Sequence, residues 1–192
     1  MSVSDAGTIM TDEIKIIIAG FGGQGVVAAG NVIARACVIE GKNVTGMVSY
    51  GAEMRGGTAN ATIVISEGEI SSPVVERPDM AILMNQPSLD KFEPLILDEG
   101  LAVLNTSLVD RKVRREDLQV VTINASGIAH ELGNVRVANI VALGAFIKKT
   151  GLLQKASIEQ AVADLFAGKK ASLVELNIRA LTEGMSRMVD ES

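Results

Sequence analysis

The chain has 192 residues, 47% hydrophobic and 21% charged, so it is long enough for one domain with a closed core and too short for two. Aromatic residues make up 3% and there is no tryptophan, which leaves aliphatic side chains to build the core and suits a parallel sheet covered by helices. The formal net charge of −5 argues against a nucleic-acid-binding protein, for which a basic face is expected. We therefore expect a single domain over residues 1–192, with residues 1–12 as a flexible tail.

Cysteine usage and hydropathy argue against further classes. The single cysteine, Cys37, rules out an internal disulfide and a four-thiolate cluster held by this chain alone. The longest nearly apolar stretch, Val137–Ile147, is shorter than the roughly 20 residues that a membrane span needs. The acidic first segment lacks the apolar run of a signal peptide. These features predict a cytoplasmic protein without a membrane partner.

The first part of the chain predicts a strand, a helix and a second strand, at residues 14–19, 24–40 and 43–49. This order implies a right-handed parallel crossover. Residues 58–66 alternate polar and apolar side chains as a half-exposed strand does. A turn at Glu67–Glu69 then leads into a brief returning strand that stops at Pro73.

The second part predicts buried strands followed by a helical tail. Strands are expected at residues 79–85, 101–107 and 118–125, a short helix or turn at 88–96, and helices at 135–149, 157–166 and 172–188. The alternation predicts an α/β fold, a Rossmann-like three-layer domain with a mixed, mostly parallel sheet and helices on both faces.

A glycine loop, "GFGGQG", lies between the first strand and the first helix. Gly20, Gly22 and Gly25 satisfy G-x-G-x-x-G in the position that the dinucleotide fingerprint requires. Glycines let the backbone approach a ligand, and the free N–H groups at the start of a helix favour an anion. The loop is therefore a candidate phosphate site.

Two other interpretations of this loop stay open. A dinucleotide site needs an acidic residue at the end of the second strand, but no acid lies between Asn43 and Ala52, which weakens the case for NAD. A P-loop is excluded because no Lys-Ser/Thr pair follows the glycines. A tight turn without a ligand is the remaining alternative.

A second loop, "SYGAEMRGG" at residues 49–57, ends the second strand at the same edge as the glycine loop. It combines Tyr50, Glu53 and Arg55 with three glycines. Ligands and partners of open α/β sheets gather at this edge, and arginine suits phosphates or carboxylates. We expect a binding or interface role, with a plain surface connection as the alternative.

Other polar residues have simpler interpretations. Asn85 and Gln86 follow a buried strand at the same edge, where they could face a ligand or cap the helix after Pro87. His130, the only histidine, is expected at the surface or as a cap. The basic run "RKVRRED" at residues 111–117 is better explained as a solvated loop than as a binding patch.

Four motifs in order carry a family resemblance: "GFGGQGVVAAGNVIARA", "SYGAEMRGGTAN", "SSPVVERPDMAILMNQPSLDKF" and "ELGNVRVANIVALGA". Together they resemble the gamma subunit of 2-oxoacid:ferredoxin oxidoreductases, from Ile14 to about Phe166. The resemblance implies a subunit that is not catalytic alone, in a complex that oxidatively decarboxylates a 2-oxoacid with coenzyme A and reduces ferredoxin.

The resemblance also implies partners and cofactors. Thiamine diphosphate, Mg and iron–sulfur clusters would belong to alpha and beta subunits, with a delta subunit as a further candidate, and ferredoxin would meet the assembled complex. This chain would hold no cofactor, and a homodimer of the isolated chain stays open.

Site roles follow residue by residue from the matching motifs. Gly20, Gly22, Gly23, Gln24 and Gly25 are expected at the phosphates of coenzyme A, with Asn85 and Gln86 nearby. Tyr50, Glu53 and Arg55 are expected to dock on the thiamine-binding subunits. The loop "SYGAEMRGGT" resembles 2-oxoglutarate and branched-chain types more than the "SFGGERRGA" of pyruvate types, so 2-oxoglutarate is the preferred substrate and indolepyruvate an alternative. A stand-alone nucleotide- or NAD(P)-binding protein and a purely structural subunit are the rival functions.

Overall fold

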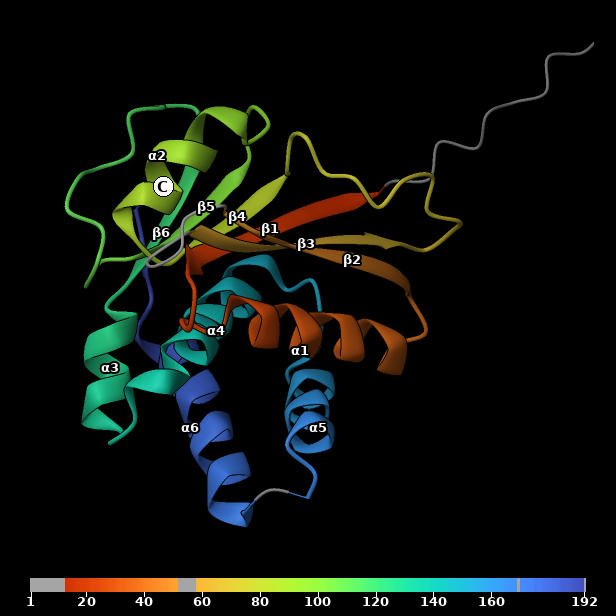
Figure 1. Ribbon diagram of the computed structural model, residues 1–192, viewed down its shortest axis with the longest axis vertical. Coiled ribbons are helices and arrows are strands. Elements are labelled where there is room, and N and C mark those ends of the chain that lie inside the picture. The colour runs from red at the N-terminus through yellow and green to blue at the C-terminus, as the bar shows by residue number, and fades with distance from the viewer. Residues whose placement is uncertain (1–12, 52–57, 169, 192) are drawn as a thin grey trace, which may run out of the picture.

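The computed structural model describes residues 13–51, 58–168 and 170–191, and one sheet runs through it with helices on both faces (Figure 1). The strands are β1 (Ile14–Phe21), β2 (Asn43–Tyr50), β3 (Thr58–Ser66), β4 (Met80–Leu83), β5 (Leu101–Asn105), β6 (Gln119–Ile123) and β7 (Val189–Asp190). The helices are α1 (Val26–Ile39), α2 (Gln86–Phe92), α3 (Ala125–Glu131), α4 (Ala138–Thr150), α5 (Lys155–Leu165) and α6 (Ala171–Arg187), with 3-10 turns at Glu93–Leu95 and Val135–Val137. The α/β fold expected from the sequence is confirmed.

The strand order in the described sheet is β2-β3-β1-β4-β5-β6-β7. Neighbouring strands from β1 through β4 and β5 to β6 pair in parallel, while β3 pairs antiparallel with both β1 and β2. The strands on either side of α1 therefore run in the same direction, as the sequence predicts. They are not neighbours, however, because β3 lies between them.

Two features of this region differ from the sequence prediction, and the position of β3 explains the first. We expected a half-exposed strand, but seven of its nine residues are buried, and only Thr58 and Thr62 are partly exposed. Neighbours on both edges and α1 on one face enclose it, and its small polar side chains, such as Asn60 and Ser66, can be buried. The prediction of a brief returning strand before Pro73 is wrong, because that segment forms bends and irregular backbone. Proline removes a donor there, and the Ser71 N–H bonds to the carboxylate of Glu13.

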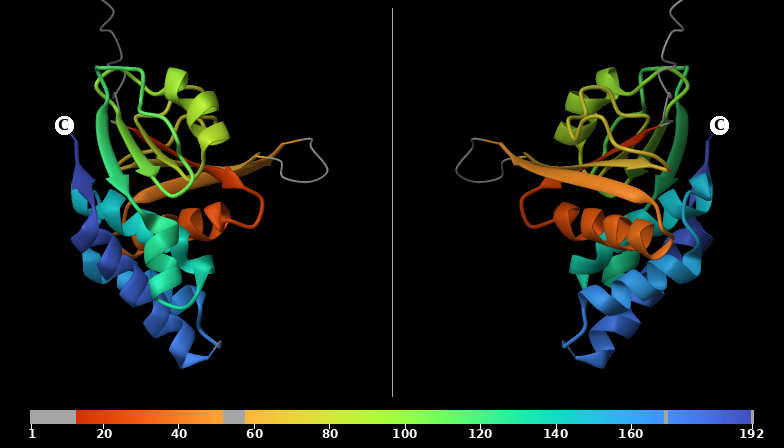
Figure 2. Two further views of the ribbon diagram at one scale, coloured as in Figure 1. Left: turned by 90° about the vertical axis from the view of Figure 1, so that its left-hand side faces the viewer. Right: turned by 90° about the vertical axis from the view of Figure 1, so that its right-hand side faces the viewer.

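The two faces of the sheet carry helical layers of different size (Figure 2). α1 and α4 pack on one face, and α5 and α6 pack outside them, whereas α2 and its 3-10 turn cover part of the other face. β1 supplies both cores by alternation: Ile16 and Ile18 join the larger core, and Ile17 and Ala19 join the smaller one. A strand buried on both faces accounts for the continuous apolar run at the start of the chain.

The helical tail is confirmed as α4, α5 and α6, while α3 and the short β7 were not predicted. None of the helices in the described ranges has both the length and the apolar character needed to cross a membrane.

Candidate functional site at the carboxyl edge of the sheet

The glycine loop lies where several parallel strands end. It follows β1, and β4, β5 and β6 end at the same edge because they run parallel to β1. β2 runs in the same direction, so Tyr50 also lies at this end of the sheet. Open α/β sheets bind ligands outside the carboxyl ends of their strands.

Backbone conformation makes glycine necessary within the loop. Gly23 has φ of 94° and Gly25 has φ of 75°, in the left-handed region that favours glycine. Gly25 is also the N-cap of the 14-residue helix α1, and no described side chain caps that end. Gly22 and Gly23 are exposed. The loop therefore presents accessible backbone at the positive end of a helix dipole.

Gln24 folds back over the loop and stabilises it. Its Oε1 accepts a hydrogen bond from the Phe21 N–H at 2.6 Å and another from Asn85 Nδ2 at 2.9 Å. A Cβ atom at Gly20 would lie 2.7 Å from this Oε1, so Gly20 makes room for the Gln24 side chain. The side-chain Oε1 of Gln24 thus holds the loop to the start of α2.

The side chains of Asn85 and Gln86 have different partners in the structure. Asn85 is fully buried, and its Oδ1 accepts a hydrogen bond from the Ser88 N–H at 2.9 Å, so it caps α2 while it contacts Gln24. Gln86 instead accepts hydrogen bonds from the N–H groups of Asp110 and Arg111 and donates to Asp90. The structure therefore brings Asn85 to the glycine loop and places Gln86 at the start of the basic segment, residues 111–117.

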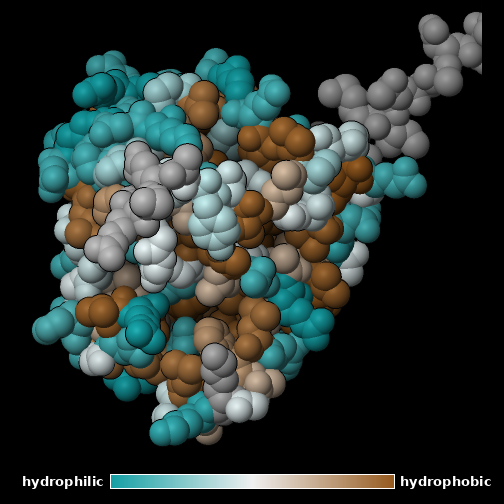
Figure 3. All heavy atoms as spheres, in the orientation of Figure 1, coloured by the Kyte–Doolittle hydropathy of each residue, from teal (hydrophilic) through white to brown (hydrophobic). Residues whose placement is uncertain are grey.

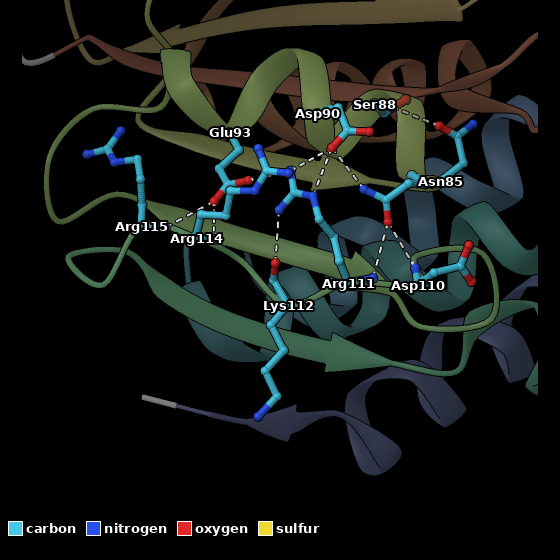
Figure 4. A network of polar contacts seen from close by, with 10 residues as sticks. Asn85, Ser88, Asp90, Glu93, Asp110, Arg111, Lys112, Arg114 and Arg115 are labelled. Carbon is cyan, nitrogen blue, oxygen red and sulfur yellow. Dashed lines mark hydrogen bonds and ion pairs between the residues drawn. The ribbon is translucent and has the colours of Figure 1, made fainter.

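The basic segment is anchored on α2 and the 3-10 turn that follows it by a network of ion pairs (Figure 4). Arg111 Nη2 lies 2.7 Å from both Asp90 Oδ1 and Glu93 Oε2. Burial of Glu93 alone would raise its pKa, but hydrogen bonds from Arg111 and from the N–H groups of Arg114 and Arg115 outweigh that effect and lower the pKa. The run is a loop, as predicted, but Arg111 and Arg115 are paired within the chain rather than simply solvated.

Asn139 is a residue of this site that the sequence interpretation missed. It lies on α4 at 4% exposure, and its Nδ2 donates to the Gly25 carbonyl at 2.8 Å, across 114 residues of sequence. A Cβ atom at Gly25 would lie 2.6 Å from the same Nδ2. The available signal was a polar residue inside the otherwise apolar stretch of residues 137–147.

The expected interface residues are only partly described. Tyr50 is 69% exposed at the end of β2, whereas Glu53 and Arg55 lie outside the described residues. Met47 and Val48 on the same edge strand are also exposed, beside a groove of about 170 Å³ between α1 and β2. Figure 3 shows apolar side chains gathered over this part of the molecule.

A family model described as pyruvate ferredoxin/flavodoxin oxidoreductase matches residues 15–187. The chain belongs to this family. Ketoisovalerate oxidoreductase subunit VorA of Methanothermobacter marburgensis is 36% identical over 174 residues, which cover 90% of this chain and 36% of that protein. 2-Oxoglutarate synthase subunit KorC of Methanocaldococcus jannaschii is 35% identical over 158 residues, covering 81% of this chain and 83% of that protein. The chain thus spans about a third of VorA and most of KorC.

A solved structure of similar size agrees. The keto/oxoacid ferredoxin oxidoreductase gamma subunit from Geobacter sulfurreducens superposes with a TM-score of 0.80 at 30% identity, covering 91% of this chain and 95% of that chain. The resemblance inferred from the four sequence motifs is confirmed at the level of the family.

This family member does not reproduce the geometry of a dinucleotide site. Such a site places its ribose-binding acid on a parallel strand next to the strand that precedes the glycine loop. Here β1 has the antiparallel β3 in that position, and β2 with its acid-free end is one strand further away. The NAD alternative therefore lacks both the acid and the strand that would carry it.

Groups that could hold a metal are scattered. Among the described residues, no three His, Cys, Asp or Glu side chains come together as a metal site. Burial raises the pKa of the Cys37 thiol to about 12, so it remains protonated in the core. His130 is exposed on α3.

Proposed function

We propose that this chain is the gamma subunit of a multisubunit 2-oxoacid:ferredoxin oxidoreductase. The complex would decarboxylate a 2-oxoacid oxidatively, form its acyl-CoA and reduce ferredoxin. The family match over residues 15–187 carries this proposal, and the gamma-subunit structure from Geobacter sulfurreducens supports it. Thiamine diphosphate, Mg and the iron–sulfur clusters would be held by alpha and beta subunits, and a delta subunit would complete some assemblies.

Within the complex, the glycine loop binds the phosphates of coenzyme A. Gly22 and Gly23 are exposed, and the uncapped start of α1 offers N–H groups that are not used by helix hydrogen bonds. Coenzyme A brings several negative charges, which a helix N-terminus attracts. Asn85 supports the loop through Gln24, while Gln86 is engaged elsewhere.

The end of β2 docks on the thiamine-binding subunits. Exposed Tyr50 is the described anchor, and Glu53 and Arg55 are its polar neighbours in sequence. Tyrosine and arginine are enriched among the residues that dominate interface energy. Exposed Met47 and Val48 extend this surface along the same strand.

The proposed substrate is 2-oxoglutarate. The second-loop sequence favours it, and one relative is named 2-oxoglutarate synthase. Another relative is named for ketoisovalerate, so a branched-chain 2-oxoacid is the second candidate. A substrate panel on the purified complex would decide, because the specificity pocket belongs to the other subunits.

A charge change at Gly23 tests the coenzyme A site. A Cβ atom there meets nothing within 4 Å, so Gly23→Asp and Gly23→Asn share the same backbone strain and differ mainly in charge. We expect Gly23→Asp to weaken coenzyme A binding by about tenfold more than Gly23→Asn, measured by titration of the assembled complex.

Gly41 provides the matched control for this experiment. It has φ of 75°, also has open space around its Cβ position, and follows the opposite end of α1. Gly41→Asp and Gly41→Asn should leave coenzyme A affinity unchanged. Equal affinities for the two Gly23 variants would contradict the proposed site.

Co-purification tests the assembly itself. The tagged chain, isolated under anaerobic conditions, should bring down larger subunits that contain iron and thiamine diphosphate. Arg55→Ala should reduce this recovery if the second loop docks on those subunits. A colourless chain without partners would contradict the proposed complex, and NAD titration would then test the nucleotide-binding alternative.

A further inference from the structure

Asn139 makes a hydrogen bond that the adjoining helix does not need. The Gly25 carbonyl already accepts the first hydrogen bond of α1 from the Ala29 N–H at 3.0 Å. Asn139 Nδ2 donates to the same oxygen at 2.8 Å, from a different helix. Removing the Asn139 amide would therefore leave α1 with its own starting hydrogen bond.

Stability does not explain an amide at this position. Asn139 is buried on α4, and its Oδ1 has no hydrogen-bond partner within the described part of the chain. A buried acceptor without a partner destabilises a fold, whereas an apolar side chain of similar size avoids that penalty. The amide therefore has a role that an apolar residue could not fill.

That role is to fix the orientation of one peptide group in a loop whose glycines allow many backbone conformations. Gly23 and Gly25 have positive φ and no side chains of their own to limit their motion. Asn139 holds the Gly25 carbonyl from the larger helical layer, and Asn85 holds Gln24 from the start of α2 on the other side of the sheet. Because the Gly25 carbonyl and the Val26 N–H share one peptide plane, holding the carbonyl also directs that N–H.

We propose that Asn139 is a positioning residue for the ligand of the glycine loop. It orients the Gly25–Val26 peptide so that the free N–H groups of α1 face a phosphate of coenzyme A. This inference rests on the proposed function, in which the loop binds coenzyme A. It adds a residue from α4 that does not itself need to touch the ligand.

The test uses Asn139→Leu and Asn139→Ala in the assembled complex. Leucine is close in shape to asparagine but has no amide, and Asn139→Ala is the second variant in case leucine disturbs folding. We expect the KM and Kd for coenzyme A to rise at least fivefold, while kcat at saturating coenzyme A, the KM for the 2-oxoacid and the thermal unfolding temperature stay close to those of the parent. Asn177→Ala is the control, because Asn177 is equally buried but donates within α6 to the Leu173 carbonyl.

Three outcomes would overturn the inference. Unchanged coenzyme A affinity in both folded variants, with Gly23→Asp still weakening binding, would reject Asn139 but leave the proposed site intact. Lower stability without any change in coenzyme A affinity would make Asn139 purely structural. If neither the Gly23 nor the Asn139 variants affect coenzyme A, the proposed site fails together with this inference.

Discussion

At the scale of single residues, Asn85 joins two parts of the candidate site through one side chain. Its Oδ1 caps α2, and its Nδ2 donates to Gln24. Asn85→Asp keeps an acceptor for the Ser88 N–H but loses the donor and faces the Gln24 oxygen with a second oxygen. For a fully buried group, we expect a loss of about 1–3 kcal/mol in the free energy of unfolding, measured by urea denaturation.

Asn43→Asp is the matched control for this substitution. Asn43 Nδ2 also donates a hydrogen bond, to the Gly68 carbonyl at 2.9 Å, but from an exposed strand end. The same chemical change should cost less than about 0.5 kcal/mol there. If both variants lose equal stability, the link between Asn85 and Gln24 contributes nothing specific.

The residues that sequence could identify are those whose signal is local. The glycine spacing predicted the loop because close packing at Gly20 and positive φ at Gly25 both require glycine within a few positions. Asn139 could not be assigned in this way, since its partner Gly25 is distant in sequence. The pairing depends on where α4 packs, which no short motif encodes.

At the scale of elements, α4 and α6 cross at two glycines. A Cβ atom at Gly144 would lie 2.2 Å from the Leu181 carbonyl oxygen, and one at Gly184 would lie 1.9 Å from that of Val141. Alanine normally stabilises a helix by about 1 kcal/mol relative to glycine. Here the backbone contact must open, so we expect Gly144→Ala to destabilise the fold by about 1–3 kcal/mol net in thermal or urea unfolding.

Thr182→Ala tests whether the helix crossing, rather than helix propensity, accounts for the destabilisation expected from Gly144→Ala. Thr182 lies on the exposed side of α6, next to the contact in sequence but outside it. Its substitution should be neutral or slightly stabilising. An equal or higher melting temperature for Gly144→Ala would mean that the two helices can separate at no cost.

Periodicity predicted most elements but not the neighbours of each strand. The buried runs of β1, β4 and β5 were recognisable because both faces of these strands are covered. The alternating pattern of β3 suggested exposure, yet its insertion between β1 and β2 buries it. Burial of a strand depends on its place in the sheet, which is a tertiary property.

At the scale of the whole molecule, ion pairs connect segments that the sheet alone does not hold. Arg115 joins the basic segment to Asp98 before β5, Arg187 joins α6 to Glu131 on α3, and Arg35 joins α1 to Asp164 on α5. The side chains in these ion pairs are exposed or partly exposed, so each pair contributes modestly to the stability of the fold. Their shared property is that they need ionised carboxylates.

This requirement predicts the response of stability to acid. Hydrogen bonds and nearby cations lower the pKa values of Asp90, Asp117, Glu131 and Asp164, and the net effect on buried Glu93 is also a lowered pKa. A folded-state pKa below the unfolded value means that the unfolded chain takes up more protons in acid. The stabilisation is therefore complete above the unfolded pKa values of about 4 and is lost as the pH falls below them.

The urea midpoint should accordingly stay level from pH 7 to pH 5 and fall steeply between pH 4 and pH 2. Glu93→Gln separates the buried network from the surface pairs, because glutamine keeps an acceptor for the Arg114 and Arg115 N–H groups but removes the charge facing Arg111. We expect it to lower stability by about 1–2 kcal/mol at pH 7 and to reduce the loss in acid. A variant that is destabilised equally at pH 7 and pH 3 would show that the Glu93 charge plays no part in the acid response, which would then rest on the surface pairs.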